Sequence, residues 1–179
     1  MTGRPRFAFS LVELLVVMAI IGILTAVTFT AVNGVRSGRN LSTASDMVLD
    51  HFMLARQNAL TKNARVRWQI VSVPDDRNGD ASAFRRLQLE IFDAAARQWK
   101  PLRRPASLPL TIFADPARST LLTNNAAGAT NAVVFLSSGR TWLNPNGNYT
   151  LTLCDDKNTN NFITLQLDPL SGRCRTFQP

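Results

Sequence analysis

The stretch that decides the fold is residues 9–32, which read FSLVELLVVMAIIGILTAVTFTAV. It contains one charged residue, Glu13, and Arg4 and Arg6 stand just before it. From Leu14 to Val32 about nineteen residues without a charge or proline would form roughly 28 Å of helix, close to the roughly 30 Å of a bilayer's hydrocarbon core. We therefore expect a membrane-spanning helix over 9–32, and the two arginines favour a cytoplasmic N-terminus.

Glu13 is the feature that a plain anchor does not explain. A carboxylate inside a membrane-spanning segment costs about 2.5 kcal/mol or more, so it indicates a function. One alternative is an uncleaved anchor in which Glu13 has no role. Another is a cleaved secretory signal, but such a signal usually has an apolar core of about 7–15 residues and an Ala-x-Ala site, and this segment fits neither feature.

The run AFSLVELL at residues 8–15 resembles the processing site of type IV prepilins and type II secretion pseudopilins. The resemblance implies that a prepilin peptidase removes a leader, residues 1–8, by cutting between Ala8 and Phe9. It also implies that the new amino group of Phe9 is methylated. Ala8 departs from the family pattern, which usually has glycine before the cut.

The same resemblance gives Glu13 a role as the fifth residue of the mature chain. There it would pair with the α-amine of a neighbouring subunit, so that both charges are compensated and the register of assembly is set. The implied partners are other pilin or pseudopilin subunits, the prepilin peptidase and membrane lipid.

A second helical pattern follows the apolar run. Apolar residues recur at spacings of three and four, at Ala44, Val48, Phe52, Ala55 and Ala59. This spacing predicts an amphipathic continuation of the helix over 33–63, loosened near Gly34 and Gly38, with its apolar face packed on a sheet.

After Asn63 the pattern alternates in the manner of strands. The predicted strands are Arg65–Val71, Arg86–Phe92, Leu110–Phe113, Ala132–Leu136, Tyr149–Cys154, Phe162–Leu167 and Arg173–Phe177. A long N-terminal helix followed by an antiparallel β domain over 64–179 is an α+β fold. It is also the layout of pilins, in which a long N-terminal helix packs on an antiparallel β-sheet.

Two further segments narrow the resemblance. Residues 44–68, with the helical run Ala55-Arg56-Gln57-Asn58-Ala59 and then Asn63 and a strand, resemble the minor pseudopilin subset, the H-type or FimT-like group. The ending Ile163–Arg173 also resembles a verrucomicrobial cassette family of prepilin-like proteins. We therefore expect a minor subunit of a type IV pilus or type II secretion pseudopilus, held in the inner membrane with its C-terminal domain periplasmic or extracellular.

Cys154 and Cys174 are the two cysteines of the chain. Because both lie beyond the membrane on this topology, in an oxidising compartment, they predict a disulfide between neighbouring strands. Such a bond closes a loop of about twenty residues and contributes about 3 kcal/mol. Two free thiols are the alternative.

The run Gly172-Arg173-Cys174-Arg175 resembles the Gly-Arg-x-Arg element that contributes to DNA binding in FimT-like minor pilins associated with DNA uptake, so a DNA-binding minor pilin for DNA uptake is the alternative function. A strand would send Arg173 and Arg175 to one face, where they could contact phosphates. The alternative is a turn glycine followed by two arginines that keep a strand soluble. The net charge of +8 permits an anionic partner without specifying one.

No catalytic site is expected, so the chain is not predicted to be an enzyme. His51 is the one histidine, and there is no His-Glu-x-x-His, no phosphate-binding glycine loop and no Cys-x-x-Cys. Two turns have the first-half spacing of a calcium loop, but neither has the glycine at position six or the glutamate at position twelve. They are Asp76, Asn78 and Asp80, and Asp156, Asn158 and Asn160. Solvated turns without metal are therefore favoured; the pseudopilin resemblance keeps calcium as a second interpretation of the later turn.

Overall fold

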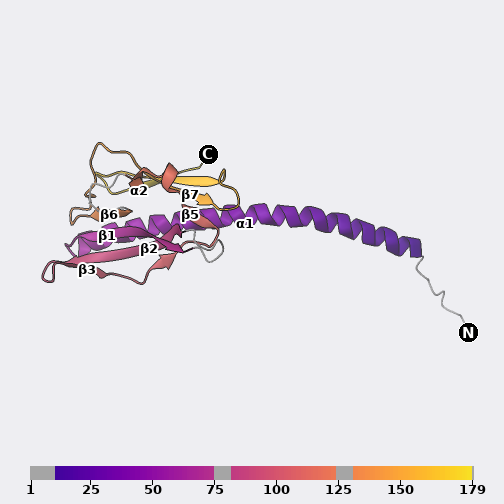
Figure 1. Ribbon diagram of the computed structural model, residues 1–179, viewed down its shortest axis with the longest axis horizontal. Helices are drawn as coiled ribbons and strands as arrows, with labels where there is room; N and C mark the ends of the chain where they lie inside the picture. Colours follow the sequence, from indigo (N-terminus) through magenta and orange to yellow (C-terminus); the bar gives the residue numbers. More distant parts are fainter. Residues whose placement is uncertain (1–10, 75–81, 124–130, 179) are drawn as a thin grey trace, which may run out of the picture. The chain divides into compact units, whose positions relative to one another are not determined.

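The structure, a computed structural model, describes residues 11–74, 82–123 and 131–178, and in the helix it leaves the side chains of 26–37 undescribed. The chain divides into two units, Met1–Ser37 and Gly38–Pro179. The first unit holds the start of helix α1 (Leu11–Thr61), and the second holds the rest of α1 and all the described strands (Figure 1).

Helix α1 is 51 residues long and helical hydrogen bonding continues through Gly34 and Gly38. The expected loosening at these glycines therefore does not interrupt the helix. Asn63 has a φ of 46°, the left-handed conformation that often follows the last helical turn. The helix ends at Thr61, two residues before the predicted boundary at 63.

The described residues form nine strands in one sheet, and every pairing is antiparallel. The strands are β1 (Val66–Pro74), β2 (Ser82–Asp93), β3 (Gln98–Pro101), β4 (Ala106–Ser107), β5 (Ile112–Ala114), β6 (Ala132–Phe135), β7 (Tyr149–Asp155), β8 (Phe162–Leu167) and β9 (Cys174–Phe177). Their order is β6-β1-β2-β5-β7-β8-β9, and β3 and β4 also pair with β2. Two short helices, η1 (Pro116–Arg118) and α2 (Thr120–Thr123), follow β5.

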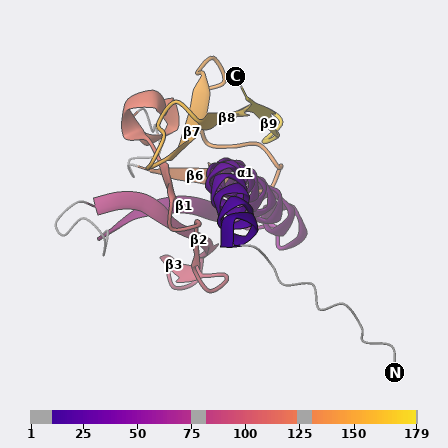
Figure 2. The ribbon, with the colours of Figure 1, turned by 90° about the vertical axis from the view of Figure 1, so that its right-hand side faces the viewer.

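The core lies between α1 and the sheet. The predicted apolar face of the helix, Ala44, Val48, Phe52, Ala55 and Ala59, is at most 2% exposed. The Phe52 ring lies 4.5 Å from the ring of Trp68 on β1 and 6.1 Å from that of Phe135 on β6. Within the Gly38–Pro179 unit, Figure 2 shows β1–β3 on one side of the last part of α1 and β7–β9 on another, so the sheet curves around that part of the helix.

All seven predicted strands are present, with ends that differ by a few residues. Strands β3 and β4 are absent from the prediction, because the prolines at 101, 105 and 109 favour a loop there. Both strands lie off the main path of the sheet, and Pro101 ends β3, where a missing N–H is tolerated.

Candidate assembly and anion-binding sites

The first candidate site is the start of α1, where Glu13 lies in the first helical turn. Ala8 and Phe9 lie outside the described residues. Glu13 is exposed, and every large hydrophobic side chain between Leu11 and Leu24 is between 47% and 79% exposed. Because they surround the helix, this segment needs apolar partners on all sides.

In the described part of the chain, no helix meets the combined length and hydropathy required to cross a membrane.

The second candidate site is a polar hollow of about 320 Å³ beside the start of β9. Arg173 and Arg175 are both exposed and both line it, together with Gln166 and Asp168. The Asp168 carboxylate accepts hydrogen bonds from the Ser171 hydroxyl, at 2.6 Å, and from the Leu170 N–H, at 3.0 Å, and these bonds lower the pKa of Asp168. The hollow therefore combines two exposed guanidinium groups with a carboxylate that is engaged in its own turn.

Gly172 directly precedes Arg173 in the chain. Its φ of +65° lies in the left-handed region, and a Cβ there would stand 2.6 Å from the carbonyl oxygen of Gly139. That oxygen accepts a hydrogen bond of 3.2 Å from Nε of Arg56 on α1. Gly172 is thus a turn glycine, as the alternative interpretation expects, and it directs the chain into Arg173.

The predicted disulfide is wrong, because Cys154 and Cys174 are both free thiols. The expected meander β7-β8-β9 exists, but Cys154 lies opposite Phe162 and Cys174 lies opposite Leu167 on β8. Those positions are five residues apart, or about 17 Å along a strand, whereas disulfides need Cα atoms within about 7 Å. Burial raises the pKa of both thiols, that of Cys174 to about 12.

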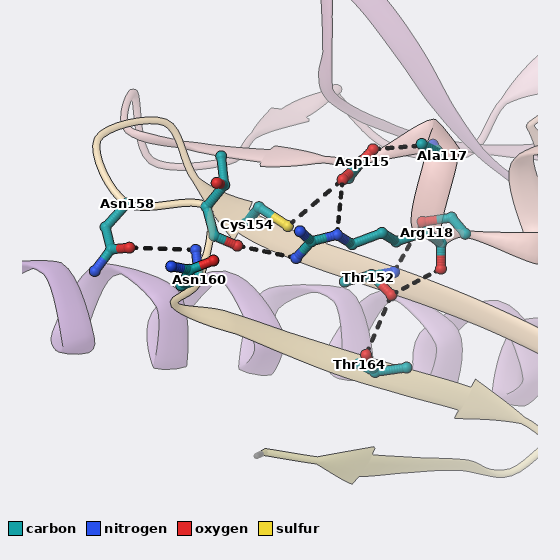
Figure 3. A network of polar contacts seen from close by, with 10 residues as sticks. Asp115, Ala117, Arg118, Thr152, Cys154, Asn158, Asn160 and Thr164 are labelled. Carbon is teal, nitrogen blue, oxygen red and sulfur yellow. Dashed lines mark hydrogen bonds and ion pairs between the residues drawn. The ribbon is translucent and has the colours of Figure 1, made fainter.

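A polar network surrounds Cys154 and joins β7 to η1 (Figure 3). Asp115 accepts a hydrogen bond of 2.9 Å from the Ala117 N–H, which caps η1, and pairs with Nε of Arg118 at 3.5 Å. Arg118 in turn donates to the Thr159 carbonyl at 3.0 Å and lies over the Phe162 ring. These contacts hold the β7–β8 turn against η1 and give Arg118 a structural role.

The turn with calcium-like spacing is part of this region. The Asn160 N–H donates to Oδ1 of Asn158 at 3.2 Å, and the Lys157 N–H donates to Oδ1 of Asp155 at 3.0 Å. The oxygens of Asn158 and Asp155 thus close local turns. Among the described residues no three His, Cys, Asp or Glu side chains form a cluster suited to a metal, and the other calcium-like turn, 76–80, lies outside them.

His51 lies on α1 as a boundary residue, half-buried, in agreement with the sequence interpretation. Burial, and then the nearby charge of Arg103, lower its pKa. Its Nδ1 is buried and has no hydrogen-bond partner among the described residues.

Two models of known protein families match this chain, one over its N-terminal segment and one over most of the rest. The family model described as type II transport protein GspH matches residues 43–171, and the model of the prokaryotic N-terminal methylation motif matches residues 3–29. The chain belongs to the GspH family. The family and the motif together identify a minor subunit of the type II secretion and type IV pilus class.

Solved structures agree in fold. The minor pseudopilin EpsH from the type II secretion system of Vibrio cholerae has 14% identity and a TM-score of 0.55, over 79% of this chain and 95% of that chain. The type IV minor pilin FimU of Pseudomonas aeruginosa has 14% identity and a TM-score of 0.51, over 79% of this chain and 89% of that chain. No curated protein matches the sequence. Members of the GspH family are structural pilin-type subunits that assemble with other pilin subunits, not a family of enzymes.

Proposed function

We propose that this chain is cut between Ala8 and Phe9, methylated on Phe9, and assembled through α1 as a minor subunit of a pseudopilus or pilus. The observation that supports this most directly is an exposed helical segment from Leu11 to Leu24 that is apolar apart from Glu13 in its first turn, inside the region matched by the methylation motif. The subunit acts as a substrate of the prepilin peptidase and catalyses nothing itself.

The proposed location is the inner membrane, crossed once by residues 9–32. The N-terminus would be cytoplasmic and the Gly38–Pro179 unit periplasmic or extracellular. The apolar surface of the helix supports this, since it calls for lipid or the helices of other subunits.

Glu13 is proposed to pair with the α-amine of Phe9 in a neighbouring subunit. Processing creates that amine at the head of an apolar segment, where an unpaired charge is costly. A carboxylate from another subunit compensates both charges at once and fixes the axial stagger of the two helices.

The first test is to co-express the chain with a prepilin peptidase and analyse the membrane form by intact mass and N-terminal sequencing. A start at N-methyl-Phe9 is expected. A start at Met1 would contradict the proposal.

The second test compares two isosteric changes that each remove one carboxylate from the same helix. Glu13→Gln should leave cleavage intact and reduce incorporation into filaments, measured by shear and sedimentation. Asp46→Asn, at an exposed site on α1, should leave incorporation unchanged. Equal incorporation of both variants would refute the pairing role of Glu13.

DNA binding is a second candidate, supported by the shared hollow of Arg173 and Arg175. DNA binding should appear at low salt, fall as salt rises, and be lost in the double variant Arg173→Ala/Arg175→Ala. The variant Arg39→Ala/Arg104→Ala, which removes two exposed arginines elsewhere, is the matched control. Absence of binding at low salt would remove this candidate.

A further inference from the structure

The face of the sheet that points away from α1 carries a group of arginines and aromatic rings. On β1, Trp68 and its alternate neighbours are buried toward the helix, so Arg67 and the preceding Arg65 lie on the opposite face. Phe92 on β2, Trp99 on β3 and Trp142 after β6 meet them there. We call these five residues, Arg65, Arg67, Phe92, Trp99 and Trp142, the arginine–aromatic patch.

The rings of the patch are stacked against the guanidinium groups. The guanidinium carbon of Arg65 lies 4.9 Å from the Phe92 ring centre and 5.6 Å from that of Trp142. That of Arg67 lies 4.5 Å from the Trp99 ring centre. Such contacts occupy the flat faces of a guanidinium group and leave its N–H edge as the donor surface.

The two arginines differ in charge compensation. Arg67 donates from Nε to Glu90 at 2.8 Å, and Lys100 pairs with Asp93 at 2.5 Å, so both acidic side chains near the patch are engaged. Within the described ranges of the chain, no carboxylate lies in ion-pair distance of Arg65. Arg65 is exposed and its guanidinium group lies over two rings, so it is available to an oxyanion.

A hollow of about 170 Å³ opens between these groups, and Ala132 and Val134 of β6 also line it. Trp142 is 52% exposed, so part of its ring remains open to a ligand. The site thus offers one ring that is half exposed, an apolar lining and one planar cation that has no ion-pair partner among the described residues.

This combination fits an acidic sugar better than a nucleic acid strand. Strand-binding surfaces stack successive bases on successive rings. Here the Phe92 and Trp99 rings lie edge to face at 5.3 Å, each beside a guanidinium group, and neither is among the exposed hydrophobic residues. Arg65 lies over the Trp142 ring as well, but that side chain is 52% exposed, so it is the ring with the most surface open to a ligand. A single pyranose ring can pack its C–H face on Trp142 while its carboxylate accepts hydrogen bonds from Arg65.

We propose that the arginine–aromatic patch binds acidic polysaccharide, with a uronate carboxylate on Arg65 and the sugar ring on Trp142. This activity is additional to subunit assembly and does not depend on Glu13.

The test is a fluorescence titration of the full chain in detergent with trigalacturonate. Two of the three tryptophans lie in the patch, while Trp68 is buried in the core and gives a constant background. A saturable change is expected, and the neutral sugar maltotriose should bind far more weakly. Arg65→Gln should weaken binding by about tenfold or more, the loss expected for one charged hydrogen-bonding partner.

Three further variants separate the site from general basicity. Arg65→Lys keeps the charge but loses the planar fork, so it should also weaken binding. Trp142→Ala should also weaken binding, because it removes the ring on which the sugar packs. Binding by this variant is measured by calorimetry, since it lacks one of the fluorescent tryptophans of the patch. Arg39→Ala/Arg104→Ala, two exposed arginines that do not line the hollow of the patch, should bind as the unmodified chain does, and the melting temperatures of all variants should match.

Several results would overturn the proposal. They are the absence of saturable binding at low salt, unchanged affinity in Arg65→Gln, or affinity for a thymidylate oligomer or for polyglutamate that equals or exceeds that for trigalacturonate. Tighter binding of the thymidylate oligomer would assign the patch to nucleic acid, and tighter binding of polyglutamate would assign it to an acidic protein.

Discussion

Gly172 occupies a position where a side chain has no room, and this leads to the first prediction at the residue scale. Its φ is left-handed, and a Cβ at this position would stand only 2.6 Å from the Gly139 carbonyl oxygen, so both features oppose substitution. Gly172→Ala should lower the free energy of unfolding by about 2 kcal/mol or more in urea denaturation.

Gly38 provides the matched control for that substitution. It is helical, and a Cβ there would meet nothing within 4 Å. Gly38→Ala should leave the free energy of unfolding unchanged or raise it by about 0.5–1 kcal/mol. Similar losses in both variants would show that the fit of Gly172 against Gly139 is unimportant.

His51 makes stability sensitive to mild acid. Its pKa in the folded chain lies below the ordinary value of 6.5, through burial and then Arg103, with Asp50 opposing them. As pH falls through 6.5, the unfolded chain therefore takes up a proton before the folded chain does, and stability decreases. His51 is the one histidine of the chain. When the pH is lowered from 7.5 to 5.5, the urea midpoint should therefore fall less in His51→Gln than in the unmodified chain. An equal fall of the urea midpoint in the two proteins would contradict this role of His51.

At the scale of elements, the spacing of apolar residues along the sequence predicts the buried face of a helix and the alternating faces of strands. The recurrence of Ala44, Val48 and Phe52 predicts the buried face of α1, since a helix brings such positions to one side. Alternation likewise predicts β1, β2 and the terminal meander. Among the described strands, the short β3 and β4 pair with β2 alone, and they are too short for alternation along their own residues to predict them.

The spacing of residues along the sequence does not predict contacts between elements that are distant in the chain. The arginine–aromatic patch joins Arg65, Trp99 and Trp142 from separate parts of the chain, and the register of β1 with β2 and β6 is what brings them together. The Gly172 turn depends in the same way on Gly139 and Arg56. Sequence motifs predicted Glu13, Arg173 and Arg175 as candidate residues because each lies in a short local run.

The cysteines give a prediction at this scale. Strand β8 separates the two cysteine-bearing strands, so denaturing alkylation without reductant should add two adducts to the intact mass. In the folded chain at neutral pH, alkylation should be slow, because burial raises the pKa of both thiols. A mass without adducts until reductant is added would establish a disulfide and contradict the arrangement of β7 to β9.

At the scale of the whole molecule, the buried core and the exposed apolar segment lie in different units. Every buried hydrophobic residue of the described chain lies between Leu41 and Leu167, inside the Gly38–Pro179 unit. The exposed apolar segment Leu11–Leu24 belongs to the Met1–Ser37 unit. The buried core of the described residues therefore includes no residue of the segment that carries Glu13.

This division predicts that a chain starting at Gly38 folds by itself. It retains the whole apolar face of α1 that packs on Trp68 and Phe135, so its thermal unfolding should be cooperative, with a midpoint close to that of the same unit in the full chain. A chain starting at Val48 is the informative comparison, because it lacks the buried Leu41 and Ala44 and should lose several kcal/mol, on the order of 2–5 per buried leucine removed. If the chain starting at Gly38 unfolds without a cooperative transition, then residues before Gly38 support the fold, and the separation between the core and the assembly helix fails.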